Sequence, residues 1–248
     1  MNASPFGLTG KTILVTGASS GIGYATATLC AAMGATIIAC GREETRLAAL
    51  LAGLSGPGHR QIAGDLTDVA YRQSLVADLP PLDGVVFSAG AAVMAPLRMV
   101  SEAHLDAMLD VNFKAPVLLT QALLSKKKLA GGASLVYVTS AAAHFAPYAT
   151  AMYSGAKAAL IAVVRTIAIE HAKAGIRANS VAPGYINTPM LSGLQKTMSM
   201  QESISHAALG IIEPEDVAAG IVYLLSPASR WVTRSGLLID GGLSLHIR

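Results

Sequence analysis

Residues 13–23 read Ile-Leu-Val-Thr-Gly-Ala-Ser-Ser-Gly-Ile-Gly, and this stretch decides the fold. A short β-branched run leads into a glycine-rich turn, which opens a helical stretch over residues 22–33. In such a turn Gly17 permits the tight bend, Gly21 lets the backbone approach a ligand, and Gly23 lets the helix pack against the strand. The helix N-terminus then favours an anion such as a pyrophosphate. The stretch therefore predicts a nucleotide site at the first strand–helix connection.

The rest of the chain repeats this order of a short strand followed by a longer helix. Buried strands, which show little polar alternation, are expected at residues 12–15, 36–39, 85–87 and 135–138, with weaker ones at 176–181 and 237–239. Helical periodicity connects them over residues 22–33, 43–54, 101–128 and 151–174. The alternation predicts a Rossmann-type, doubly wound parallel sheet of about seven strands with helices on both faces. No Pro/Gly/Ser-rich linker interrupts it, so residues 1–248 are expected to form a single domain.

The composition argues against several classes of protein. Apolar residues make up 52% of the 248 positions, charged residues 13%, and the formal net charge is +3. These values argue against disorder, and the lack of a basic stripe argues against a nucleic-acid partner. The basic run Lys126–Lys128 is interpreted as solvated residues at a helix end. Cys30 and Cys40 have neither metal-site nor disulfide spacing, so buried, reduced thiols are expected.

The sequence also carries expectations about location and mobility. The first ten residues lack a charged start followed by an apolar stretch, and no uncharged apolar run reaches the length of a membrane span. A cytoplasmic protein without a membrane partner is therefore expected. Residues 188–209 break the strand–helix rhythm with Met190, Met198 and Met200 among Ser, Gly and Gln. A mobile substrate lid is favoured there over an ordinary surface helix pair.

Three polar residues form a candidate catalytic group. Tyr153 and Lys157 are four apart in a helical segment and project from one face. Ser140 follows the strand at 135–138 and would stand at a strand's carboxyl end, where parallel sheets bind ligands. Such a group would suit the reduction of a carbonyl by hydride, the reaction that the family resemblance described next implies, because that reaction needs a proton donor and a hydrogen-bond donor at the developing oxyanion. We expect Tyr153 to be the acid/base, with its pKa lowered by the Lys157 ammonium, and Ser140 to steady the substrate oxygen.

The spacings Thr-Gly-x-x-x-Gly-x-Gly at 16–23 and Tyr-x-x-x-Lys at 153–157 resemble those of the short-chain dehydrogenase/reductases, in their single-domain branch. The resemblance covers nearly the whole chain. It implies a small carbonyl or alcohol substrate and, with the long apolar-rich helices at 101–128 and 151–174, a homotetramer. It also implies that Asn112 is a fourth catalytic residue, which bends the backbone and holds a water for proton relay. An Asn that is merely satisfied inside a helix is the alternative.

The resemblance further implies a set of residues that hold a nicotinamide dinucleotide. They are Gly17, Ser19, Ser20, Gly21, Ile22, Gly23, Gly41, Arg42, Asp65, Leu66, Ala89, Gly90, Tyr153, Lys157, Pro183, Gly184, Ile186 and Thr188. In the motif at 183–188, Ile186 and Thr188 would grip the nicotinamide carboxamide, which implies transfer of the pro-S hydride.

The end of the second strand bears on which dinucleotide is bound. By resemblance, the carboxylate that would hold the ribose 2′-hydroxyl of NAD corresponds to Gly41, and Arg42 stands beside the gap. A guanidinium suits a 2′-phosphate, which favours NADP(H) over NAD(H). A solvated Arg42, or Glu43 acting as a hydroxyl acceptor, is the alternative.

Two further positions near the cofactor are compared with the family pattern. Asp65 would accept from the adenine amino group, or else Asp65 or Thr67 caps the next helix. Ser88 stands where the family has an Asn that ties neighbouring strands together.

The substrate end of the site is expected to be lined by residues 93–97, 141–151 and 188–209. His144, Phe145 and Tyr148 would supply its bulky contacts beside a run of alanines, which suggests an apolar or mixed substrate. The sequence does not separate a small-ketone, sugar or steroid dehydrogenase from a 3-oxoacyl carrier-protein reductase. A non-catalytic dinucleotide-binding sensor is a further alternative.

Overall fold

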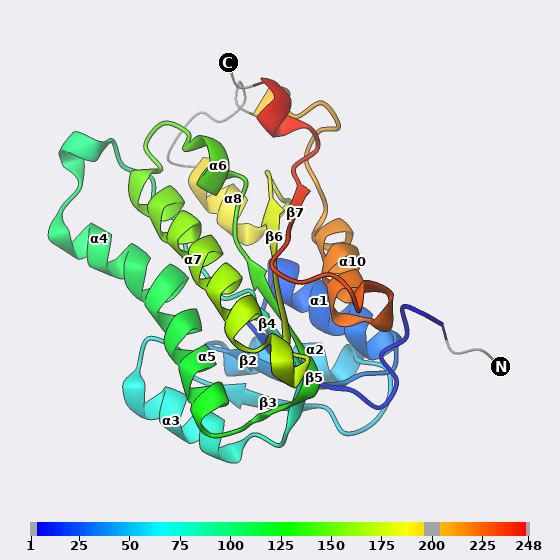
Figure 1. The fold of residues 1–248 in the computed structure, drawn as a ribbon. Helices are drawn as coiled ribbons and strands as arrows, with labels where there is room; N and C mark the ends of the chain where they lie inside the picture. Colours follow the sequence, from blue (N-terminus) through cyan, green and yellow to red (C-terminus); the bar gives the residue numbers. More distant parts are fainter. Residues whose placement is uncertain (1–3, 196–203, 247–248) are drawn as a thin grey trace.

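The computed structural model describes residues 4–195 and 204–246. These residues contain a seven-stranded parallel sheet with the order β3-β2-β1-β4-β5-β6-β7 (Figure 1). The chain starts at β1 in the middle of the sheet, winds outward to β3, and then returns to β4 on the other side. The topological switch point therefore lies between β1 and β4, where such sheets bind ligands. The predicted fold class is confirmed.

The strands are longer than the apolar runs that predict them. They are β1 Thr12–Thr16, β2 Thr36–Gly41, β3 Arg60–Ala63, β4 Leu82–Phe87, β5 Leu129–Val138, β6 Arg177–Pro183 and β7 Gly236–Ile239. Strand β3 is absent from the expected set, because an edge strand is only partly buried and its sequence, Arg-Gln-Ile-Ala, has no apolar run. The early part of β5 contains two glycines, and its pairing with β4 shifts register between Leu82 and Gly84.

The helices that connect the strands are α1 Gly21–Ala32, α2 Glu44–Gly53, α3 Val69–Asp78, α4 Glu102–Leu109, α5 Ala115–Ser125, α6 Ala142–Phe145, α7 Ala151–Glu170, α8 Pro189–Gln195 and α10 Pro214–Leu225. The helical stretch expected over residues 101–128 is present from residue 102 to residue 125, but it contains an unexpected π-helical turn at Asp110–Lys114, between α4 and α5. Helices α3, α6 and α10 are additions to the expected set, and α8 lies in the segment that was expected to be a lid.

Two apolar clusters cover the two faces of the sheet. Helices α1, α2 and α10 contribute to the first, where Ile13 and Val15 of β1 meet Ile221 of α10. Helices α3, α5 and α7 contribute to the second, where Leu14 meets residues such as Leu160. Alternate residues of β1 thus point to opposite faces, as a sheet that is covered on both sides requires.

Helix α7 is apolar enough to be tested as a membrane span. Among the described residues it is the one helix that is long and apolar enough to cross a membrane, and 44% of its apolar stretch is buried inside the structure. It packs against β6 and contributes Leu160 and Val164 to the core. A buried core helix can have the same length and apolar composition, so these two properties are weak evidence for a membrane segment.

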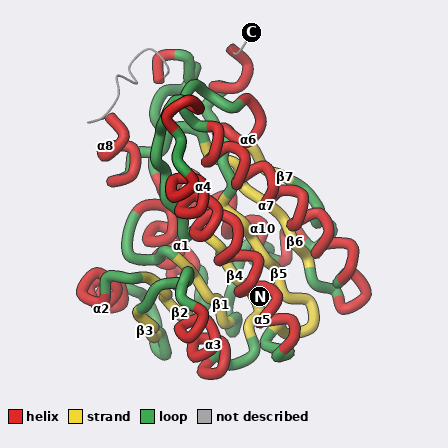
Figure 2. Tube along the Cα trace, turned by 90° about the vertical axis from the view of Figure 1, so that its left-hand side faces the viewer, coloured by secondary structure: helices red, strands yellow, loops and turns green. Residues whose placement is uncertain are grey.

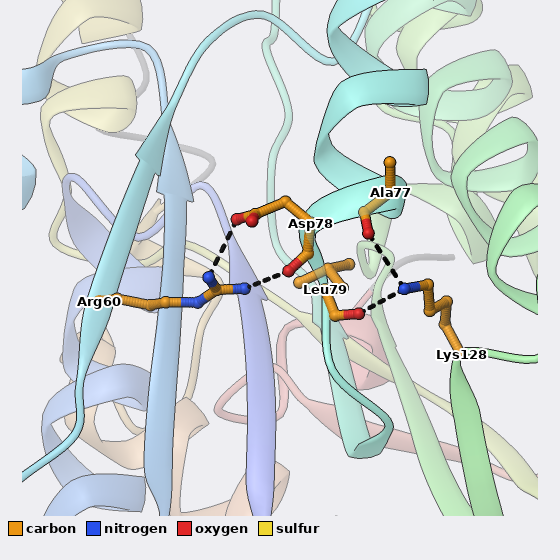
Figure 3. A network of polar contacts seen from close by, with 5 residues as sticks. All are labelled: Arg60, Ala77, Asp78, Leu79 and Lys128. Carbon is orange, nitrogen blue, oxygen red and sulfur yellow. Dashed lines mark hydrogen bonds and ion pairs between the residues drawn. The ribbon is translucent and has the colours of Figure 1, made fainter.

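Two basic side chains, those of Arg60 and Lys128, bind the C-terminal end of α3 (Figure 3). Arg60 of β3 donates to the Asp78 carboxylate at 2.9 Å and to its carbonyl at 2.7 Å. Lys128 donates from Nζ to the carbonyls of Ala77 and Leu79. The last carbonyls of a helix lack intrahelical partners and carry partial negative charge, so both cations stabilise this end. The basic run Lys126–Lys128 lies just after the end of α5, as expected, but Lys128 donates its hydrogen bonds to the end of α3.

The carboxyl ends of the strands face one end of the molecule. Helices α6 and α8 lie beyond those strand ends, at the top of Figure 1 and again at the top of Figure 2, which is turned by 90°. The two cysteines lie in the core instead, where both are free and buried as expected.

Candidate active site

A cavity of about 430 Å³ opens at the carboxyl ends of the strands. Its lining includes every residue that the sequence assigns to catalysis or cofactor binding, except Gly23. These residues come from segments as far apart as the turn after β1 and the turn after β6. The fold therefore gathers the proposed machinery in one place, which the sequence alone could not show.

The turn after β1 is built for close approach of a ligand. Gly17 has a φ of +68°, and a Cβ there would lie 2.8 Å from the Ala89 backbone. A Cβ at Gly23 would lie 2.3 Å from the Gly17 carbonyl oxygen, so this glycine shapes the turn from behind. Ser20 is the N-cap of α1 without a capping side-chain hydrogen bond, and the first turn has no acidic residue. The cradle thus fits the pyrophosphate of a dinucleotide.

The ends of β2 and β3 form the far wall of the cavity. Gly41 and Arg42 line it, and no carboxylate among the described residues forms an ion pair with the Arg42 guanidinium. Asp65 accepts from the Thr67 backbone N–H and hydroxyl, both at 2.8 Å. These hydrogen bonds, with a smaller contribution from the Arg42 charge, hold the pKa of Asp65 below its usual range. The N-cap of α3 is Asp68, so the alternative that Asp65 or Thr67 caps this helix is wrong.

Thr16 performs the strand-tying task at the end of β4. Its Oγ1 accepts from the backbone N–H groups of Ser88 and Ala89, at 3.1 and 3.2 Å, and donates to the Val86 carbonyl. These hydrogen bonds therefore connect the end of β1 with the end of β4, and Ala89 and Gly90 line the cavity wall. This accounts for the tolerance of a serine at position 88.

Ser140 and Tyr153 meet across the cavity wall. Their hydroxyl groups are hydrogen-bonded, and Ser140 Oγ also accepts from the Ala142 backbone N–H at 3.2 Å. Tyr153 is half-buried near the start of α7. Burial raises its pKa above the ordinary value of 10.0, against an opposing effect of the Ser140 hydrogen bond. The expectation of a lowered tyrosine pKa is wrong for this structure, because loss of hydration on burial is the largest effect on this phenol.

Lys157 lies one turn further along α7 and is buried. Its Nζ donates to the Val138 carbonyl at the end of β5 at 2.9 Å, and lies 5.8 Å from the centroid of the Tyr153 ring. Burial lowers the pKa of this lysine from 10.5 to about 8. The ammonium is thus fixed between the strand end and the phenol, on the same helix face, as the spacing predicts.

Asn112 lies in the π-helical turn and is almost fully buried. Its Nδ2 donates to the carbonyls of Ala91, at 2.9 Å, and Met108, at 3.0 Å, and its Oδ1 accepts from the Ala91 N–H. A Cβ at Gly90 would lie 3.0 Å from Asn112 Oδ1 and 3.5 Å from Lys157 Nζ. Asn112 thus ties the widened turn to the cavity wall close to Lys157, and π turns of this kind are frequent at functional sites.

The substrate end of the cavity agrees only in part with the residues expected there. Phe145, Met94 and α8 line it, but His144 and Tyr148 do not, and the Tyr148 side chain is 73% exposed. Successive residues of the short helix α6 point in different directions, so Phe145 lines the cavity and His144 does not, while Tyr148 lies beyond the end of this helix. The expected lid at 188–209 includes α8, whereas Met198 and Met200 lie outside the described residues.

Several lining residues were not anticipated. Ala107, Met108 and Val111 enter from α4 and the π turn, Tyr185 follows β6, and Leu243 comes from near the C-terminus. Tyr185 lies inside the motif at 183–188, but no local motif marks the other four, because each has an ordinary apolar role in its own segment. The proximity of Met108 to Asn112 in an apolar helical stretch is the one signal that could have found it.

Comparison with known proteins identifies the family. Residues 17–244 match the family model described as Enoyl-(Acyl carrier protein) reductase. The human "Dehydrogenase/reductase SDR family member 4" is 34% identical over 247 residues, which cover 95% of this chain and 88% of that protein. A 3-oxoacyl-[acyl-carrier-protein] reductase of Thermotoga maritima is 34% identical over 95% of this chain and 98% of its own length.

A solved structure shows the same fold with a cofactor. It is assigned as an NAD(P)-dependent gluconate 5-dehydrogenase of Beutenbergia cavernae and contains bound NADP at low occupancy. It superposes with a TM-score of 0.86 at 29% identity, covering 98% of this chain and all of that one. With its glycine cradle, its Ser140–Tyr153–Lys157 group and this coverage, the chain belongs to the short-chain dehydrogenase/reductase family of oxidoreductases.

Proposed function

We propose that the protein is an NADP(H)-dependent oxidoreductase that interconverts a ketone or aldehyde with the corresponding alcohol. The observation that carries the proposal is the hydrogen-bonded pair of Ser140 and Tyr153 beside the buried Lys157. A nicotinamide dinucleotide in the glycine cradle would supply or accept the hydride. Residues 1–248 would act as one catalytic domain, with α8 as part of a lid.

The chain's own residues handle the proton and the substrate oxygen. Ser140 donates a hydrogen bond to that oxygen and Tyr153 delivers the proton to it in reduction, or removes it in oxidation. Because burial raises the pKa of Tyr153, its hydroxyl carries the proton that reduction requires. Lys157 holds positive charge beside the phenol and binds the cofactor ribose, while Asn112 positions the turn next to it.

Tyr153→Phe tests the chemistry. The substitution keeps the aromatic ring and removes the hydroxyl. The rate at which a ketone substrate is reduced should therefore fall by a factor of about 10² or more. Dinucleotide affinity, measured by fluorescence titration, should survive, whereas Lys157→Ala should lose both turnover and affinity. Near-normal turnover in Tyr153→Phe would leave the non-catalytic sensor as the better account.

The preference for NADP(H) rests on the wall formed by Gly41 and Arg42. Arg42 is exposed at the cavity with no ion pair among the described residues, and position 41 is a glycine rather than a carboxylate that would repel a 2′-phosphate. Arg42→Ala should weaken NADPH binding about tenfold or more and leave NADH binding unchanged. Arg46→Ala, an exposed arginine one turn along α2, is the matched control. A wild-type protein that binds NADH as tightly as NADPH would contradict the proposal.

The substrate is proposed to be an uncharged, largely apolar carbonyl compound. The described residues that line the substrate end, from Ala91, Met94, Met108, Phe145, Tyr185 and α8, include no charged side chain. A carboxylate there would be desolvated without a partner, which is costly. A panel of alicyclic ketones and matched keto acids with NADPH should show turnover of the ketones alone.

The relative from Thermotoga maritima favours a second candidate, a 3-oxoacyl carrier-protein reductase. Its acyl chain would suit the apolar end of the cavity. Including a 3-oxoacyl thioester in the same panel separates the two candidates, because a carrier-protein reductase should prefer it to every free ketone.

A further inference from the structure

A second, smaller cavity of about 180 Å³ lies beside the edge strand β7, on the face of the sheet that α7 covers. Its polar lining consists of His144, Arg165, Ser180, Arg234 and Ser235, and it includes no Asp or Glu. Apolar side chains such as Ile161 and Leu238 complete the walls. None of these residues lines the proposed active site, so the cavity is a separate feature.

Ser180 provides a hydroxyl group in this cavity. It lies on β6 and is only 3% exposed. Ser180 and Ala182 both line the cavity, whereas the intervening Val181 belongs to the core on the opposite face, as strand alternation requires. No described residue is hydrogen-bonded to the Ser180 hydroxyl, which lines the cavity. The hydroxyl is thus available to a ligand in the cavity.

Two arginines without acidic partners line the same cavity. Arg165 of α7 and Arg234 are exposed at the cavity, and neither forms an ion pair with any described carboxylate. Uncompensated arginines that share a cavity repel one another unless an anion lies between them. Their planar donor groups match the geometry of an oxyanion.

The turn that carries Arg234 is held in an uncommon conformation. Arg234 has a φ of +61°, in the left-handed region that costs a non-glycine residue about 1 kcal/mol or more. The Arg234 N–H donates to the Ala178 carbonyl at 2.8 Å, and the Ser235 N–H donates to Asn179 Oδ1 at 3.0 Å. These bonds fix the turn against β6, so the arginine is kept at the rim in spite of its backbone strain.

We propose that this cavity is a binding site for a tetrahedral oxyanion, namely phosphate or a phosphate group. Arg165 and Arg234 bind the anion from the rim, and the Ser180 hydroxyl donates to it from the floor. Helix α6 separates the two sites, since Ala142 and Phe145 line the main cavity and His144 lines this one. A bound anion therefore contacts the same short helix that borders the substrate.

Calorimetric titration of inorganic phosphate into the full-length protein tests the site. The protein is saturated with NADP⁺ beforehand, because the glycine cradle could itself bind phosphate. We expect phosphate binding that persists with the dinucleotide present and weakens about tenfold or more in Arg165→Ala. Arg234→Asn, which keeps a residue tolerant of the left-handed conformation, should weaken it similarly, and Ser180→Ala about threefold.

Arg230→Ala is the matched control, because Arg230 is an exposed arginine in the same stretch of chain that lines neither cavity. Circular dichroism verifies that each variant is folded. The proposal is overturned if saturating NADP⁺ abolishes phosphate binding, since the cradle would then be the binding site. It is equally overturned if Arg165→Ala and Arg234→Asn bind phosphate as the wild type does, or if Arg230→Ala loses as much affinity as they do.

Discussion

At the scale of single residues, Lys157 combines two opposing requirements. Its ammonium must lie beside Tyr153 and near Asn112, yet this position removes it from water and lowers its pKa to about 8. One hydrogen bond to the Val138 carbonyl offsets part of that cost. Burial of the Lys157 ammonium without a carboxylate partner among the described residues lowers the stability of the fold. Its proposed role beside Tyr153 explains why a lysine stands there.

The burial of Lys157 predicts a specific dependence of stability on pH. Between about pH 8 and 10.5 the unfolded chain holds a proton on this lysine that the folded protein has lost, so the contribution of Lys157 to the free energy of unfolding rises with pH. Relative to Lys157→Met, the wild type should gain roughly 2–4 kcal/mol from pH 7 to 10.5. Tyr153 is present in both proteins and cancels.

Urea unfolding at several pH values measures this difference. Lys126→Met, which changes an exposed lysine, should show no such trend against the wild type. A difference between wild type and Lys157→Met that stays flat across the window would mean that Lys157 is not desolvated.

At the scale of elements, the π turn at Asp110–Lys114 explains how a helix can border an active site. The extra residue in the turn places the Asn112 side chain against the Met108 carbonyl and the Ala91 backbone. The same interruption separates α4, which lines the substrate end, from α5, which packs in the core. A regular helix over residues 101–128 would not present Asn112 in this way.

Asn112→Ala removes the hydrogen bonds that hold this turn. The Ala91 and Met108 groups would be left without partners, so the free energy of unfolding should fall by about 1–3 kcal/mol. Turnover should fall as well, because the turn borders Lys157 through Gly90. The matched control is Gln121→Ala, an exposed amide on α5, which should change neither quantity. Unchanged stability in Asn112→Ala would contradict a structural role for these bonds.

At the scale of the whole molecule, apolar surface remains on the helices that cover one face of the sheet. Leu118 of α5 is 42% exposed and Ile169 of α7 is 59% exposed. The outer side of α7 also presents Gly155, Ala158 and Ala162, small residues that permit close approach of another helix. An exposed surface of this kind is typical of an interface between subunits.

We therefore predict a homotetramer in which α5 and α7 face other copies of the chain. Sedimentation at micromolar concentration should show the tetramer for the wild type and smaller species for Leu118→Arg. Val69→Arg, which changes a 59% exposed residue on α3, should leave the tetramer intact. A wild-type monomer at this concentration would refute the prediction.

The sequence by itself determined the fold class and most of the proposed site. Local sequence predicts the geometry of the glycines at 17, 21 and 23 and of the pair Tyr153 and Lys157. Turn shape and helix spacing depend only on neighbours in the chain. The alternation of strands and helices determined the layers for the same reason. These features need no knowledge of what packs against them.

Only the tertiary structure decided the features that depend on distant partners. The raised pKa of Tyr153 follows from burial, which no local spacing reports. The π turn forms where Asn112 meets the backbone of Ala91, twenty-one positions away. Lys128 caps a helix some fifty positions earlier in the chain. The cavity around Ser180 exists because α6, α7 and the turn before β7 meet there. Hydration, capping and cavities are properties of contacts between segments, so they become defined only when the chain is folded.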